Sequence, residues 1–118
     1  MIYHITSLSA WKIALRDGDY HPNSLSTEGF IHCSTIQQIT RTANTLYYNQ
    51  QGLLMLCIEP QRVRAEIRYE NTSGGEELFP HIYGALNLDA VIQVVALKPN
   101  KDGTFSIPLP SEADAPDN

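Results

Sequence analysis

The run LLMLCI, residues 53–58, constrains the fold of this chain more than any other segment does. All of its residues are apolar, so no face of the run suits water, and its length is typical of a strand. The run therefore predicts a central β-strand that other elements cover on both faces. Gly52 precedes this strand and Pro60 ends it, and a chain of 118 residues is long enough for one such hydrophobic core.

A strand followed by a helix is expected at the N-terminus. The segment IYHIT, residues 2–6, has the β-branched and aromatic content of a short strand. Ser7 or Ser9 can then cap a helix that stops at Gly18. The apolar side of this helix carries Trp11, Ala14 and Leu15. Residues 19–29 are rich in turn formers and include a proline, so they are predicted to form a loop.

A second strand and helix follow this loop. The segment FIHCS predicts the strand. Ser34 or Thr35 meets the requirement for a helix N-cap, with Gln37 or Gln38 as the capping-box partner. The apolar stripe of this helix consists of Ile36, Ile39, Ala43 and Leu46. The helix is expected to run to about Tyr48.

The second half of the chain predicts strands without helices. VRAEIRYE, residues 63–70, alternates apolar and charged residues, which is typical of a strand with one solvated face. NTSGGEE predicts a flexible connector, AVIQVVAL a buried strand, and DGTFSI a closing turn with an edge strand. This order of elements indicates the α+β class, with a single domain over residues 1–109. The acidic, proline-containing tail, residues 110–118, is expected to be disordered.

Composition excludes several classes of function. The net charge is −5 and the eight Lys and Arg residues are scattered, which argues against an extended nucleic-acid groove but leaves a single bound phosphate open. No signal peptide or membrane-spanning run is visible. Cys33 and Cys57 lie in apolar runs without metal or disulfide spacing, which favours reduced, buried thiols in a cytoplasmic protein. The sequence carries no signal for an oligomeric state.

Two predicted strands each present a histidine with a hydroxyl two residues later. Side chains alternate across a strand, so His4 and Thr6 share one face of the first strand, and His32 and Ser34 share one face of the second. A third histidine, His81, lies in FPHIYG, whose proline and glycine indicate irregular backbone of the kind that lines sites. These histidines are candidate cleft residues.

Other interpretations of these residues stay open. Each histidine can be a packed residue satisfied by a backbone carbonyl. A zinc site could draw on the three histidines and Cys33, and Cys33 could be a nucleophile with a histidine base. Alternation argues against both, because it places Cys33 on the face opposite His32. No Gly-rich phosphate loop is present, although the N-terminus of the second helix after Thr35 can seat an anion.

Six motifs together resemble a bacterial family known as domain of unknown function 952. They are IYHIT, EGFIHCST, TANTLYY, IRYE, FPHIYGALNLDAV and DGTFSIP, and they span nearly residues 1–108. That family is similar in layout to the ADP-ribosyltransferase fold. The resemblance implies two N-terminal helices packed on a split sheet, mixed or antiparallel, with no resident cofactor and with NAD as a substrate.

The same resemblance implies roles for six residues. His4 and Thr6 fit the histidine and hydroxyl that hold the adenosine ribose, and Ser34 fits a ribose or phosphate contact. His32 stands near the tyrosine that packs nicotinamide in those enzymes, with His81 and Tyr83 in the segment that usually carries the catalytic glutamate.

That glutamate is missing from its usual segment, since FPHIYGALNL has no carboxylate before Asp89. Glu70 at the end of IRYE is the candidate substitute. The expected catalytic residues are therefore His32, His81 and Glu70, and the expected ligand-binding residues are His4, Thr6, Ser34 and Tyr83. What the resemblance implies is an NAD-dependent ADP-ribosyl- or phospho-transferase acting on a small nucleotide. The alternative is a binding or regulatory module that keeps the cleft and performs no chemistry.

Overall fold

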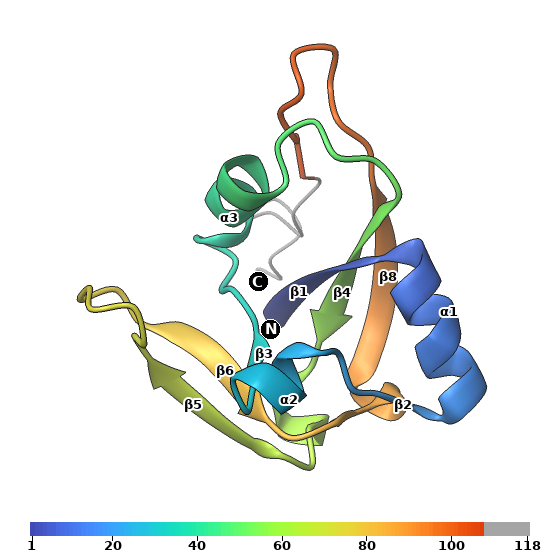
Figure 1. The fold of residues 1–118 in the computed structure, drawn as a ribbon, viewed down its shortest axis with the longest axis vertical. Coiled ribbons are helices and arrows are strands. Elements are labelled where there is room, and N and C mark those ends of the chain that lie inside the picture. The colour runs from blue at the N-terminus through green and yellow to red at the C-terminus, as the bar shows by residue number, and fades with distance from the viewer. Residues whose placement is uncertain (108–118) are drawn as a thin grey trace, which may run out of the picture.

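A computed structural model of the chain describes residues 1–107 (Figure 1). The expected disordered tail, residues 110–118, lies outside this described range. The helices are α1 (Leu8–Asp17), α2 (Ser24–Thr27) and α3 (Ile39–Leu46), with single 3-10 turns at Pro60–Arg62 and Leu88–Ala90. The strands are β1 (Ile2–Ser7), β2 (Asp19–Tyr20), β3 (Ile31–His32), β4 (Leu53–Ile58), β5 (Glu66–Glu70), β6 (Phe79–Tyr83), β7 (Leu86–Asn87) and β8 (Val91–Leu97).

The strands form three antiparallel sheets within the described residues. The β4 sheet has the order β1-β4-β8, the β6 sheet has the order β3-β6-β5, and β2 pairs with β7. Every strand pair is antiparallel, which agrees with the expected α+β class. A bridge between Tyr3 and Ser34 joins the β4 sheet to the segment that follows β3. This bridge fixes the two larger sheets beside each other.

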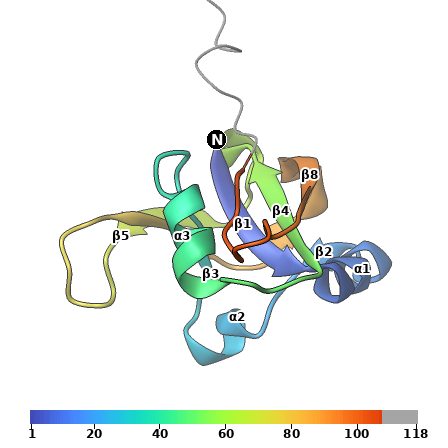
Figure 2. The same ribbon diagram turned by 90° about the horizontal axis from the view of Figure 1, so that it is seen from above.

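The predicted central strand is confirmed. β4 lies between β1 and β8, and its side chains alternate between two hydrophobic clusters on opposite faces of the sheet. Cluster 1, on the α1 side, contains Ile2, Trp11, Ala14, Tyr20, Ile31, Cys33, Leu56, Ile58, Ile82, Leu86 and Ala90. Cluster 2, on the α3 side, contains Tyr3, Ile5, Ile39, Ala43, Leu53, Met55, Cys57, Leu97 and Phe105. Seen from above, α1 and α3 lie on opposite sides of this sheet (Figure 2).

The expected N-cap and stop of α1 are both present. The Ser7 side chain accepts a hydrogen bond from the Ala10 N–H at 3.0 Å, and Gly18 ends the helix in the left-handed conformation at φ 91°. The prediction for Leu15 was wrong, because this side chain is 58% exposed. The loop predicted for residues 19–29 was also wrong in part, since this segment contains the short helix α2 and the strand β2, which pairs with the distant β7.

The α3 helix begins later than expected. Thr35 donates its backbone N–H to the Gln38 side chain at 3.0 Å, which is one half of the predicted capping box, but residues 36–38 form a turn and the helix starts at Ile39. It ends at Leu46 instead of Tyr48, and Leu46 is 68% exposed. The strand predicted from FIHCS is reduced to Ile31–His32.

Three predictions for the second half need correction. β5 covers only Glu66–Glu70, and the expected apolar face fails at Tyr69, which is 52% exposed. β8 is an edge strand with Ile92 and Val94 exposed, so it is not buried. Residues 104–107 form no strand; the Asn100 N–H donates to the Thr104 carbonyl to close a turn, and Phe105 packs in cluster 2.

The segment around His81 is regular, contrary to expectation. β6 is the middle strand of its sheet although it contains Pro80, whose carbonyl accepts a hydrogen bond from the Cys33 N–H at 3.0 Å. The connector between β5 and β6 is folded around Asn71, whose side chain accepts from the N–H groups of Ser73 and Gly75. Among residues 1–107, no helix combines the length and apolarity needed to cross a membrane.

Candidate functional site

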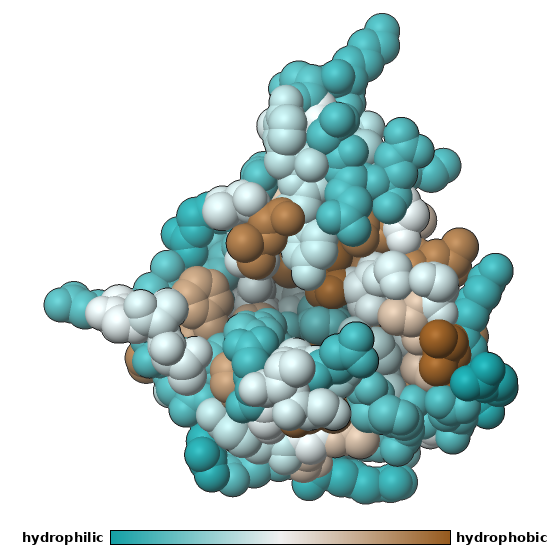
Figure 3. All heavy atoms as spheres, in the orientation of Figure 1, coloured by the Kyte–Doolittle hydropathy of each residue, from teal (hydrophilic) through white to brown (hydrophobic). Residues whose placement is uncertain are grey.

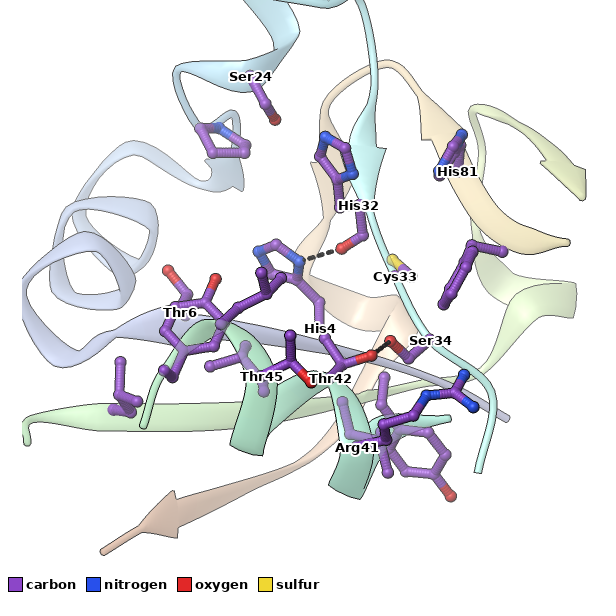
Figure 4. Close-up of a pocket in the computed structure, with 18 of the residues that line it drawn as sticks. His4, Thr6, Ser24, His32, Cys33, Ser34, Arg41, Thr42, Thr45 and His81 are labelled. Atoms are coloured by element: carbon purple, nitrogen blue, oxygen red, sulfur yellow. Dashed lines mark hydrogen bonds between the residues drawn. The ribbon is translucent and has the colours of Figure 1, made fainter. Parts of the chain in front are cut away.

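A cleft of about 720 Å³ opens between the β4 sheet, the β6 sheet and α3. This volume is typical of small-molecule sites. Figure 3 shows the hollow in the face viewed, with hydrophobic surface gathered beside α3, and Figure 4 shows the side chains that project into it. The cleft brings together all of the sequence-predicted site residues except Tyr83, namely His4, Thr6, His32, Ser34, Glu70 and His81.

His4 is held on both ring nitrogens. Nδ1 lies 2.5 Å from the His32 carbonyl oxygen and Nε2 lies 2.7 Å from the Tyr20 hydroxyl. A carbonyl can only accept, so Nδ1 carries the proton and neutral Nε2 accepts from Tyr20. Burial lowers the pKa of His4 to about 4, which keeps this ring neutral, and raises the pKa of Tyr20 to about 12. His4 therefore positions the β3 backbone and offers no unused nitrogen to a ligand.

The hydroxyl of Thr6 extends this hydrogen-bonded chain, because it lies 2.9 Å from the Tyr20 hydroxyl. Ser34 Oγ donates to Thr42 Oγ1 at 3.1 Å, and Figure 4 shows these two side chains pointing toward one another. The Ser34 and Thr42 hydroxyl groups lie in the cleft wall. Each retains further hydrogen-bonding capacity for a ligand hydroxyl.

His32 faces the cleft and its neighbours face the core. Its side chain is about half exposed and its Nε2 lies 3.1 Å from both carboxylate oxygens of Glu28. Ile31 and Cys33 are almost fully buried, as alternation along the strand requires. Burial raises the pKa of the Cys33 thiol, so this group stays protonated and is a poor nucleophile.

His81 and Glu70 form a histidine–carboxylate pair across two strands. His81 Nδ1 lies 2.9 Å from Glu70 Oε2, and the Tyr83 hydroxyl donates to the same oxygen. The hydrogen bond from Tyr83, followed by that from His81, lowers the pKa of Glu70. Within the described residues no hydrogen bond uses Glu70 Oε1. Tyr83 thus orients Glu70 without lining the cleft, whereas Glu70 itself lines it.

An aromatic stack encloses this pair. The Phe30 ring stacks on His81 with centroids 4.1 Å apart, and His32 meets His81 edge-on at 5.3 Å. His81 Nδ1 is committed to Glu70, so a ligand can meet His81 only through Nε2. Nowhere in residues 1–107 do three His, Cys, Asp or Glu side chains gather as a metal site requires.

Sequence reasoning missed one wall of the cleft. Arg41, Thr42 and Thr45 of α3 project into it (Figure 4). The Arg41 guanidinium donates to Glu77 from the β5–β6 connector, and Gln38 Nε2 donates to the same carboxylate at 3.0 Å. The signal was available in the sequence, because Arg41 and Thr45 are spaced i, i+4 on the side of α3 away from its buried residues.

The fold and site define a class of protein: a small α+β domain whose cleft lies between two antiparallel sheets and is lined by histidines and hydroxyl groups. The family model described as "Protein of unknown function (DUF952)" matches residues 5–94. The chain therefore belongs to the DUF952 family, as the six sequence motifs indicated.

Solved structures of one relative agree with this assignment. The crystal structure of protein CC0527 from Caulobacter crescentus is 29% identical, covers 89% of this chain and 92% of its own, and superposes with a TM-score of 0.80. The solution NMR structure of CC0527 is 30% identical, covers 87% of this chain and 89% of its own, and gives a TM-score of 0.76. No curated protein matches the chain.

Proposed function

We propose that the cleft binds a ribose-containing ligand of the nucleotide type, NAD or ADP-ribose among them, and that Glu70, His81 and His32 act on it. One observation carries this proposal. Glu70 is fixed through Oε2 by two donors on β6, so Oε1 is preorganised to accept a hydrogen bond from a ligand hydroxyl. The Ser34 and Thr42 hydroxyls in the same cleft suit a polyhydroxylated ligand.

The chemistry that this arrangement suits is cleavage of an N-glycosidic bond. The bond between the ribose carbon and the nicotinamide nitrogen breaks, its electron pair leaves with nicotinamide, and positive charge develops on the ribose. The negative charge of Glu70 stabilises that cation. A water or an acceptor hydroxyl then attacks the ribose carbon and loses its proton. Glu70 thereby takes the place of the glutamate that the sequence lacks in its usual segment.

A binding module without chemistry is the second candidate, and one observation favours it. The donors Tyr83 and His81 that fix Glu70 also lower its pKa and draw on its charge, which weakens the stabilisation it can give to a cation. Such a module would bind the ligand and release no nicotinamide.

Calorimetric titration with NAD, ADP-ribose and 2′-phosphorylated ribonucleotides, beside an assay for released nicotinamide, tests both candidates. Under the transferase proposal Glu70→Gln lowers nicotinamide release about 100-fold or more and changes NAD affinity less. His32→Ala weakens binding of the ligand.

Glu66→Gln is the matched control, because Glu66 lies on the same strand face, is exposed and does not line the cleft. Binding without release of nicotinamide in the wild type selects the binding module. If none of these ligands binds, both candidates fail.

A further inference from the structure

The polar side of α3 points to a specific geometry of ligand, and we propose that the cleft takes a nucleoside phosphate whose phosphate binds Arg41 and whose base packs on Leu46. This inference rests on the proposed function, because it concerns the same cleft. It adds the orientation of the ligand in the cleft and the protein carboxylate that competes with the phosphate for Arg41.

The charges in the cleft define the phosphate end. Among the described residues that line it, Arg41 is the one Lys or Arg. Its planar guanidinium can pair with two oxygens of a phosphate. In the structure it pairs with Glu77 from the opposite wall, a carboxylate that Gln38 also holds. Arg41 lowers the pKa of Glu77, so this carboxylate is charged and occupies the position of an anion at neutral pH.

The apolar end lies at the other end of the same helix. Leu46 is 68% exposed although it lines the cleft, and Tyr47 and Leu53 line the cleft beside it. Exposed leucine surface next to a cavity gains free energy when a flat apolar group covers it. A nucleobase has that chemistry.

The helix sets the distance between the two ends. Arg41 and Thr45 lie on one row of α3, and Thr42 and Leu46 lie on the next row. With a rise of 1.5 Å per residue, the Arg41 and Leu46 backbone positions are roughly 7.5 Å apart along the axis. A ribose separates a phosphate from a base by a comparable span, which places the ribose hydroxyls beside Thr42 and Thr45. The three chemistries of the helix thus match the three parts of a nucleotide in order.

Binding of the phosphate requires exchange at Arg41. The ligand phosphate replaces Glu77 on the guanidinium, and the β5–β6 connector, which Glu77 ties to α3, is released from that contact. Glu77 is therefore an internal competitor. Its removal must strengthen binding of phosphorylated ligands and leave unphosphorylated ones unchanged.

The experiment compares AMP, adenosine and ribose 5-phosphate by calorimetric titration. We expect AMP to bind about tenfold or more tightly than adenosine, because a charge-assisted hydrogen bond to Arg41 is gained. Arg41→Gln removes this difference, whereas Arg41→Lys keeps part of it. Glu77→Gln raises the affinity for AMP several-fold and leaves that for adenosine unchanged. Leu46→Ser weakens AMP and adenosine alike and leaves ribose 5-phosphate unchanged.

Lys12→Gln is the control for total charge, because Lys12 is exposed on α1 and does not line the cleft. Equal affinity for AMP and adenosine, or a preference for AMP that survives Arg41→Gln, overturns this inference and leaves the proposed function standing. A loss of nicotinamide release in Glu70→Gln with AMP preference unchanged supports both. Failure of NAD, ADP-ribose and all three probes to bind overturns both.

Discussion

Three histidines that look alike in the sequence do different work in the structure. His4 is partly buried, neutral and bonded on both nitrogens, His32 projects into the cleft, and His81 is fixed by a carboxylate. All three lie on strands that line the cleft, so the strand alone does not set their environments. A histidine's role therefore depends on the partners of its ring nitrogens, which a strand pattern cannot specify.

The neutral state of His4 predicts a pH dependence of stability. Its pKa is about 4 in the folded protein and 6.5 in the unfolded chain, so the unfolded chain binds more protons between these values. The contribution of neutral His4 to the free energy of unfolding is fully present above pH 6.5 and falls as the pH drops. At 1.36 kcal/mol per pH unit, the loss is about 3 kcal/mol on reaching pH 4. Urea unfolding between pH 7 and pH 5, above the range where carboxylates titrate, measures this slope.

The variant His4→Asn should be less stable at pH 7 and should lose this slope, because no group at position 4 then titrates. His21→Asn is the control, since His21 is an exposed loop residue beside Asp19, and it should keep the wild-type slope. A His4→Asn variant with the wild-type slope would contradict the assignment of His4 as a neutral ring in the folded protein.

The Tyr83 hydroxyl should control the ionisation of Glu70. It is the largest cause of the lowered pKa of that carboxyl, ahead of His81. Tyr83→Phe removes the donor and keeps the ring under Arg68, whose guanidinium carbon lies 4.2 Å from the ring centroid. The pKa of Glu70 should rise toward its ordinary value, as followed by the ¹³C shift of its carboxyl group against pH. Tyr69→Phe is the control, because Tyr69 is exposed on β5 next to Glu70; this change should leave the pKa of Glu70 unaltered.

Elements with a complete local signal were predictable from the sequence. The apolar run of β4 and the cap and stop of α1 are confirmed because each depends on neighbours along the chain. α2 and β2 are four and two residues long, which is too short for any periodicity to register. The edge position of β8 was missed because apolar content does not distinguish a covered strand from an edge strand, and tertiary pairing decides it.

The corner after β6 offers a test at the level of an element. Gly84 has φ 154°, and a Cβ there would lie 2.9 Å from the Cβ of Ala65, the residue just before β5. Gly84→Ala must push these segments apart, and we expect a loss of about 1–3 kcal/mol in the free energy of unfolding. Chemical denaturation measures it.

A double variant isolates the clash at this corner. Ala65→Gly removes the opposing methyl group, so Gly84→Ala should cost less in that background, and the difference is the energy of the contact. Gly74→Ala is the control, because its φ of 93° carries backbone strain while a Cβ meets nothing within 4 Å. Equal costs of Gly84→Ala in both backgrounds would show that the contact with Ala65 is not the cause.

The cleft is a property of the whole molecule, because its walls come from segments far apart in the chain. Alternation predicted that His4 and Thr6 share a face, and that His32 and Ser34 do. It could not place Glu70 beside His81, because that contact depends on the register between β5 and β6, in which Arg68 pairs with His81. The long connector between these strands does not specify the register. The Arg41–Glu77 contact across the cleft is unpredictable for the same reason.

The position of β4 between two clusters predicts that the molecule unfolds as one unit. Met55 is fully buried in cluster 2, while Trp11, the one tryptophan of the chain, lies in cluster 1 on the other face of the sheet. Met55→Ala should cost about 2–5 kcal/mol through lost burial and a residual cavity. Because β4 contributes side chains to both clusters, loss of cluster 2 must remove the support of cluster 1.

Urea unfolding followed by Trp11 fluorescence and by far-UV circular dichroism tests this coupling. In Met55→Ala both midpoints should fall by the same amount and stay coincident, which is the behaviour of a two-state domain. Ile92→Ala removes a similar amount of apolar side chain from the exposed edge of β8 and should shift both midpoints little. If the Trp11 transition keeps its wild-type midpoint while the circular dichroism transition moves, the two clusters unfold separately. The cleft would then join two independently stable halves, because its walls draw on both clusters.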